Sequence, residues 1–77
     1  MKAYTVEYIK NGEAYAYDNF IEGANISDIV KELSYNANRY GVDYDEIAIF
    51  DPYDDETQTI YFKVVNIYGH YKLIELV

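Results

Sequence analysis

The fold of this chain is decided by residues 25–41, which read NISDIVKELSYNANRYG. Apolar side chains recur there with the spacing of one helix face, at Ile26, Ile29, Val30, Leu33, Ala37 and Tyr40. Asn25 is a favourable N-cap residue, and Gly41 is a favourable residue at which a helix ends. The segment therefore predicts an amphipathic helix between Asn25 and Gly41. Its outer face is expected to carry Lys31, Glu32, Tyr35, Asn36 and Asn38.

The residues before this helix predict a β-hairpin. Two runs rich in strand-forming residues, 4–9 and 14–17, flank Asn11-Gly12, the dipeptide most typical of a two-residue hairpin turn. Such a turn pairs Lys10 with Glu13, Tyr8 with Tyr15 and Val6 with Tyr17. The opposite face carries smaller and more mixed side chains, and the pattern leaves open which face belongs to the core.

Three further strands are expected after the helix, at residues 46–50, 59–67 and 71–76. Their short connections favour an antiparallel meander. Residues 1–77 therefore predict a single α+β domain in the order ββαβββ, with one helix packed on a five-stranded, mainly antiparallel sheet. One helix cannot cover both faces, so the second face is expected to be polar, paired with another subunit or used for binding.

Composition disfavours catalysis. The chain has 77 residues, and at about this size folding buries only ~60% of the surface of the unfolded chain, which leaves little room for a deep active site. It contains no Cys and one His, so thiolate chemistry and a zinc site of Cys or His ligands are excluded. His70 lies in an expected turn without a local partner that would make it a catalytic base. We expect no enzyme activity and no cofactor.

Charge narrows the class of partner. There are 14 Asp and Glu against 6 Lys and Arg, a net charge of −8. Such a charge repels nucleic acid and anionic lipid, so any electrostatically steered partner is expected to be basic. The start of the chain has no apolar signal region, and no run approaches the ~20 apolar residues of a membrane span. We expect a soluble, cytoplasmic protein without direct contacts to nucleic acid or membrane.

An acidic band occupies residues 43–56, where seven of the 14 carboxylates lie without any Lys or Arg. They are Asp43, Asp45, Glu46, Asp51, Asp54, Asp55 and Glu56. Clustered carboxylates can bind Ca²⁺ or Mg²⁺, or imitate nucleic-acid phosphates in a basic groove. The spacing of a calcium-binding EF-hand is absent and a strand divides the band, which argues against a metal site. A role in solubility alone stays open.

Tyrosine is unusually frequent, with 11 residues against three Phe and no Trp. So much Tyr indicates half-buried rings, as on sheet faces and protein interfaces. Packing within the fold is expected for Tyr4, Tyr8, Tyr15, Tyr17 and Tyr40. An interface role is expected for Tyr35, Tyr44 and Tyr53.

With its compact length, its charge, its lack of a catalytic constellation and the acidic stretch from Asp43 to Glu56, the chain resembles small acidic anti-defence proteins of phages and mobile elements, of the anti-CRISPR and antirestriction type. The run Glu46-Ile47-Ala48-Ile49-Phe50-Asp51, after an amphipathic helix, looks like a segment of the antirestriction DNA-mimic family. The resemblance implies inhibition by binding, in which the basic nucleic-acid channel or recognition site of a nuclease or surveillance complex is occupied.

These observations lead to the hypothesis of an inhibitor in the cytoplasm of a bacterial host, acting as a monomer or dimer. Its partner would be a basic host protein or ribonucleoprotein complex, such as a CRISPR effector or a nuclease. The residues expected to make contact are Asp43, Tyr44, Asp45, Glu46, Asp51, Tyr53, Asp54, Asp55 and Glu56. Two alternatives remain: an antitoxin or immunity protein that neutralises a basic nuclease, and a structural or regulatory domain that dimerises through its sheet.

Overall fold

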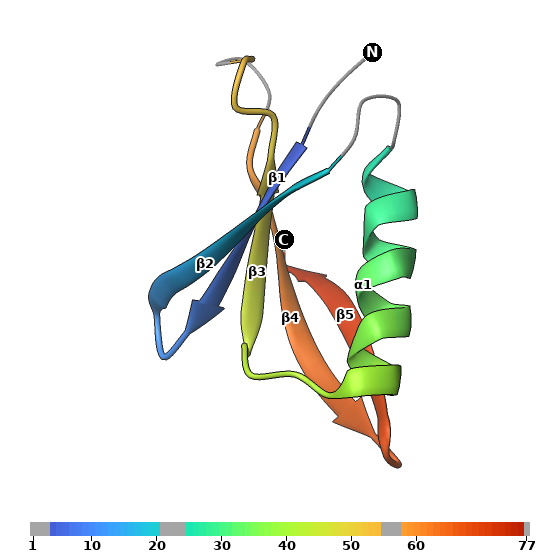
Figure 1. Cartoon of the computed structure of the whole chain (residues 1–77). Coiled ribbons are helices and arrows are strands. Elements are labelled where there is room, and N and C mark those ends of the chain that lie inside the picture. Colours follow the sequence, from blue (N-terminus) through green and yellow to red (C-terminus); the bar gives the residue numbers. More distant parts are fainter. Residues whose placement is uncertain (1–3, 21–24, 55–57, 77) are drawn as a thin grey trace.

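The computed structural model describes residues 4–20, 25–54 and 58–76, and in them one helix packs on a five-stranded antiparallel sheet (Figure 1). The elements are β1 (Tyr4–Lys10), β2 (Glu13–Phe20), α1 (Ile26–Tyr40), β3 (Glu46–Phe50), β4 (Ile60–Ile67) and β5 (His70–Leu76). The strand order across the sheet is β2-β1-β3-β4-β5, and each neighbouring pair is antiparallel. The expected ββαβββ α+β fold is confirmed. Among these residues, no helix is both long and apolar enough to cross a membrane.

The limits of α1 follow from the local signals in the sequence. The side chain of Asn25 accepts a hydrogen bond from the backbone N–H of Asp28 at 2.8 Å. At the other end, the N–H of Gly41 donates to the carbonyl of Ala37 at 2.9 Å, with a positive φ of 84° at Gly41. Both caps satisfy backbone groups that a helix end leaves without a partner. The predicted helix is therefore confirmed at both ends.

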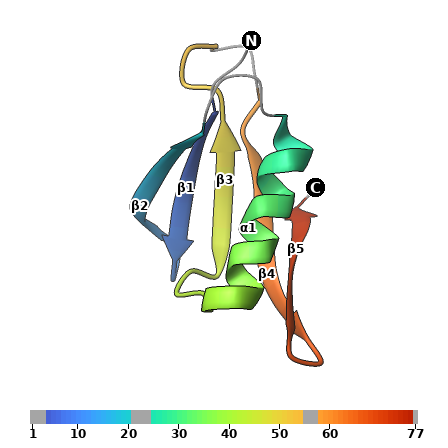
Figure 2. The ribbon, with the colours of Figure 1, turned by 45° about the vertical axis from the view of Figure 1, so that its right-hand side comes forward.

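The helix lies over one half of the sheet. The backbone of α1 lies nearest to that of β5. Both ribbon views place the helix on the β4–β5 side, away from the β1–β2 hairpin (Figures 1 and 2). Asn38 holds it there, because its amide donates to the carbonyl of Tyr71 at 3.0 Å and accepts from the N–H of Tyr71 at 2.8 Å. Asn38 is exposed, as expected for the outer face of the helix, but the helical spacing did not indicate its contact with β5. Its amide satisfies backbone groups of an edge strand, which have no strand partner on that side.

The face of the sheet under α1 forms the core, which settles the question that the hairpin pattern left open. The buried cluster comprises Tyr4, Val6, Ile29, Leu33, Ile47, Ile49 and Phe62. These residues come from α1 and from three adjacent strands, so the helix and the centre of the sheet bury each other's apolar side chains. Among the described residues, no helix lies over the opposite face (Figure 2).

The hairpin differs from its expected register by one inserted residue. Lys10 pairs with Glu13 as predicted, but Ile9 pairs with Ala14 and Tyr8 with Ala16, so Tyr15 is a β-bulge. Beyond the bulge, Tyr17 pairs with Glu7 and Asp18 pairs with Val6. The predicted Tyr8–Tyr15 and Val6–Tyr17 pairs were therefore wrong. Because side chains alternate along a strand, the extra residue moves Tyr17 to the open face and Asp18 to the helix side.

Candidate binding pocket at the hairpin end

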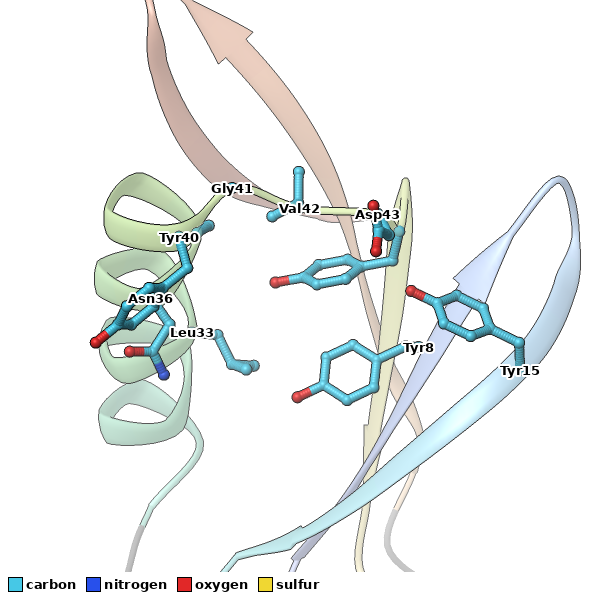
Figure 3. A pocket seen from close by; sticks show the side chains of 10 residues that line it. Tyr8, Tyr15, Leu33, Asn36, Tyr40, Gly41, Val42 and Asp43 are labelled. Atoms are coloured by element: carbon cyan, nitrogen blue, oxygen red, sulfur yellow. The ribbon is translucent and has the colours of Figure 1, made fainter.

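A pocket opens between the last turns of α1 and the β1–β2 hairpin (Figure 3). Its volume is about 290 Å³. The residues that line it are Tyr8, Tyr15, Leu33, Asn36, Ala37, Tyr40, Gly41, Val42, Asp43 and Tyr44. Because α1 sits over β4 and β5, the helix side of the hairpin is left partly uncovered, and this geometry creates the pocket.

Two tyrosines form the floor of the pocket. The ring centroids of Tyr8 and Tyr44 lie 4.9 Å apart at an interplanar angle of 48°. Both side chains are half-buried and pack against the core, and the hydroxyl of Tyr8 donates to a carboxylate oxygen of Asp18 at 2.6 Å. Burial foremost, then the hydrogen bond and charge of Asp18, raise the pKa of Tyr8 well above its usual range. Burial also raises the pKa of Tyr44.

Tyr15 forms the wall opposite the helix. Its ring reaches from β2 toward Asp43, and 52% of the side chain surface is exposed (Figure 3). Desolvation first, then the charges of Asp43 and Asp45, raise the pKa of Tyr15. Tyr15 lies on the same side as Tyr8, and the β-bulge places Tyr17, two residues later, on the open face.

Two carboxylates give this end of the molecule a negative potential. Asp43 lines the pocket and is exposed, as is Asp45 two residues later. Asp45 is held in place, because its carboxylate accepts from the N–H of Asn11 at 3.1 Å and its own N–H donates to Ile9 at 3.0 Å. The pocket is also lined by the C-terminal turn of α1, where the helix dipole places negative partial charge.

The cation of that last turn, Arg39, lies against two tyrosines, of which one, Tyr40, lines the pocket. The guanidinium of Arg39 donates to the hydroxyl of Tyr35 at 3.0 Å and to that of Tyr40 at 3.1 Å. It lies 6.0 Å and 5.6 Å from the centroids of those two rings. Among the ten described residues that line the pocket, none is Lys or Arg. The lining residues therefore include no cation of their own, and Arg39 contacts one of them, Tyr40.

The predicted contact residues separate to the two ends of β3. Asp43, Tyr44 and Asp45 lie at the hairpin end, whereas Asp51, Tyr53 and Asp54 follow the other end of the strand. A five-residue strand spans about 17 Å, so the two groups do not form one continuous band. At the far end, Tyr53 is exposed, and its N–H donates to the carboxylate of Asp51 at 2.9 Å.

Other predicted residues have different surroundings. Glu46 pairs across the sheet with Lys63, so a cation lies beside it. Asp55 and Glu56 lie outside the described residues. Within the described ranges, no three His, Asp or Glu side chains gather closely enough to hold a metal ion.

Sequence reasoning missed most of the pocket. Tyr15, Tyr17 and Tyr40 were expected to pack within the fold, yet all three are exposed. Tyr40 is 75% exposed because it ends the helix beyond the edge of the core, although the helical spacing placed it on the apolar face. Tyr8 and Tyr15 were predicted to lie on the same face of the hairpin. Their position near the C-terminal end of α1 depends on tertiary structure and was not predicted. Tyr44 was assigned to an interface and is half-buried beside Tyr8.

Comparisons with known proteins give no relative: no family model, curated protein or solved structure matches this chain.

Proposed function

We propose that this chain is a non-catalytic inhibitor of the anti-CRISPR or antirestriction type, which binds a basic nucleic-acid-recognition surface of a host defence complex. The observation that carries the proposal is the hairpin-end pocket, which combines four tyrosines with the carboxylate of Asp43. Asp45 lies beside it and adds a second exposed carboxylate. Surfaces that have evolved to hold nucleic acid are rich in Arg and Lys, which complement such a site.

Each component has a separate physical role in binding. A net charge of −8 steers the protein toward a basic surface and raises the association rate. Exposed tyrosines supply rigid contact area, which slows dissociation. In the floor of the pocket, Tyr8 lies on β1 and Tyr44 in the connection before β3, and both pack against the core, so little ordering is needed when a partner binds.

The proposal is tested in a bacterial strain with an active CRISPR or restriction system, challenged by a phage that the system recognises. Expression of the chain should restore plaque formation. The paired substitution Asp43→Asn and Asp45→Asn should abolish this effect, because it removes the carboxylate in the pocket and the one beside it, while the asparagine introduced at position 45 keeps an oxygen that accepts from Asn11.

The matched control is Glu32→Gln with Glu75→Gln, two exposed carboxylates away from the pocket. Both pairs change the net charge from −8 to −6, since each removes two negative charges. The control should retain inhibition. Equal loss in both pairs would mean that only total charge matters. No rescue of plaques against any CRISPR or restriction system would contradict the anti-defence function.

The open face of the sheet favours a second candidate, a structural or regulatory domain that dimerises through that face. Tyr61, Ile74 and Leu76 are 44%, 47% and 43% exposed, and Tyr61 pairs directly with Leu76. Exposed apolar groups on one sheet face are typical of protein interfaces. Sedimentation equilibrium distinguishes the candidates: a stable mass of twice 9.0 kDa, lost on Ile74→Lys, would support dimerisation.

A further inference from the structure

The hairpin-end pocket combines three features that each favour a positively charged group. Tyrosine ring faces, the carboxylate of Asp43 and the C-terminal end of a helix meet at one cavity, and the exposed carboxylate of Asp45 lies beside it. We infer that this pocket is an aromatic cage for one arginine side chain of a protein partner. The inference rests on the proposed function insofar as that function supplies a basic partner.

The rings provide faces on more than one side of the cavity. Tyr8 and Tyr44 are tilted by 48° to each other, and Tyr15 stands on the neighbouring strand with half of its surface exposed. The face of a phenol ring carries negative charge density, which attracts a cation within about 6 Å of the ring centre. Three phenols arranged around one space therefore attract a cation more strongly than a single exposed tyrosine does.

The chain itself shows how tyrosines hold a guanidinium. Arg39 lies 5.6 Å and 6.0 Å from two tyrosine ring centroids and donates to both hydroxyls. The pocket offers similar partners, namely the rings and hydroxyl oxygens of Tyr8, Tyr15 and Tyr44. Arg39 does not line the pocket, so this cation does not fill the cage.

The charges around the cavity point to the same class of ligand. Asp43 lines the pocket, and Asp43 and Asp45 act on the hydroxyl of Tyr15, whose pKa burial and these charges raise. The contribution of the two carboxylates to this shift indicates that their negative potential reaches the Tyr15 hydroxyl, which favours a cation beside it. The helix end contributes further negative potential, because the carbonyls of its last turn point outward.

Arginine fits this combination better than lysine does. Its planar guanidinium stacks on the faces of aromatic rings, while its N–H groups point outward in the plane of the guanidinium and donate to carboxylate and hydroxyl oxygens. A lysine ammonium is more strongly hydrated, so moving it into a tyrosine-lined cavity costs more. The pocket volume of about 290 Å³ is large enough to accommodate one long side chain.

The inference is tested by NMR on protein with ¹³C-labelled tyrosine rings. The probe is the blocked peptide Gly-Gly-Arg-Gly-Gly, and the reference is its near-isostere with citrulline, in which a neutral carbonyl oxygen replaces one nitrogen of the charged guanidinium. The arginine peptide should shift the ring signals of Tyr8, Tyr15 and Tyr44 along a saturating curve, and bind about tenfold more tightly than the citrulline peptide. The exposed rings of Tyr53 and Tyr68 should not follow the same curve.

Two substitutions separate the cage from general charge. Tyr15→Leu keeps an apolar side chain but removes the ring, and should weaken arginine binding about fivefold. Its control is Tyr17→Leu, on the same strand but outside the pocket. Asp43→Asn should weaken binding by a similar factor, and its control Glu32→Gln should not.

The possible results lead to different conclusions. Equal binding of the arginine and citrulline peptides, or unchanged binding in Tyr15→Leu, would overturn the cage. Tighter binding of tetramethylammonium than of the arginine peptide would assign the pocket to a small cation and also overturn it. If the arginine peptide binds as expected but plaques are not rescued, the cage stands and the anti-defence function fails. If plaques are rescued by Tyr15→Leu as well as by the parent chain, the function stands without the cage.

Discussion

At the scale of single residues, Tyr8 connects the core to the candidate site. Its ring packs against the buried cluster and against Tyr44, while its hydroxyl donates to Asp18. A tyrosine in an unfolded chain loses its proton near pH ~10. Folded Tyr8 has a raised pKa, mainly through burial and then through Asp18, so it keeps its proton to higher pH. The folded state therefore binds more protons than the unfolded state above pH ~10, and stability must fall as pH rises there.

Tyr8→Phe tests this argument because it keeps the ring and removes the hydroxyl. At pH 7 we expect the free energy of unfolding to fall by about 1 kcal/mol, because the hydrogen bond to Asp18 is missing. Between pH ~9 and ~11, a range that brackets the ordinary tyrosine pKa, urea denaturation should show a shallower fall in stability for the variant than for the parent chain. Tyr68→Phe, at a side chain that is 98% exposed, should leave stability at pH 7 unchanged. Parallel pH profiles for Tyr8→Phe and the parent chain would show that Tyr8 does not couple folding to pH.

At the scale of elements, the two hairpins use the same backbone geometry with different residues. Asn11 and Gly12 have φ values of 53° and 81°, and Tyr68 and Gly69 have values of 51° and 85°. Two consecutive positive φ angles are typical of a type I′ turn, for which Asn-Gly is the preferred pair. Tyr68 is therefore a strained choice at its position, since a bulky residue rarely adopts positive φ.

Tyr68→Asn should relieve this strain and stabilise the fold by about 0.5–1 kcal/mol. The exposed ring contributes almost no packing that the substitution would remove. Thermal denaturation measures the gain, and Asn11→Tyr in the other hairpin should show a loss of similar size. A destabilised Tyr68→Asn variant would mean that the Tyr68 ring makes an important contact in solution.

The elements also show which parts of the structure local sequence can predict. Asn25 and Gly41 act on backbone groups within one turn, so the helix limits could be predicted from them. The bulge at Tyr15 could not, because Asn11-Gly12 predicts uninterrupted pairing and no local signal in the hairpin indicates an inserted residue. The tie between Asn38 and Tyr71 joins residues 33 positions apart, and helical spacing alone does not indicate it.

The same distinction applies to the candidate site. Asp43 and Asp45 could be found in the sequence as part of an acidic run. Their position beside Tyr8 and Tyr15 could not, because it depends on α1 lying over β4 and β5 and leaving the hairpin side uncovered. The acidic residues form one continuous run in the sequence, but in the structure β3 separates them into two groups, one at each end of the strand.

At the scale of the whole molecule, repulsion between the surplus negative charges opposes folding, and the carboxylates near the pocket contribute to that repulsion. A net charge of −8 on 77 residues gives repulsion that opposes the compact state, most strongly at low salt. Removing the charges of Asp43 and Asp45 should therefore raise stability in about 10 mM salt, by about 0.5 kcal/mol, and by less in about 0.5 M salt, where the charges are screened.

Denaturation of the Asp43→Asn, Asp45→Asn pair at both salt concentrations measures this effect, with Glu32→Gln, Glu75→Gln as the reference of equal charge. Both pairs should be at least as stable as the parent chain, because both relieve the same repulsion and the asparagine introduced at position 45 can still accept from the N–H of Asn11. Stability would then rise or hold in both pairs while inhibition is lost in only one. If the pocket pair were instead destabilised by more than about 1 kcal/mol at both salt concentrations, these carboxylates would be holding the hairpin, and a loss of inhibition in that pair would reflect folding and not contact with a partner.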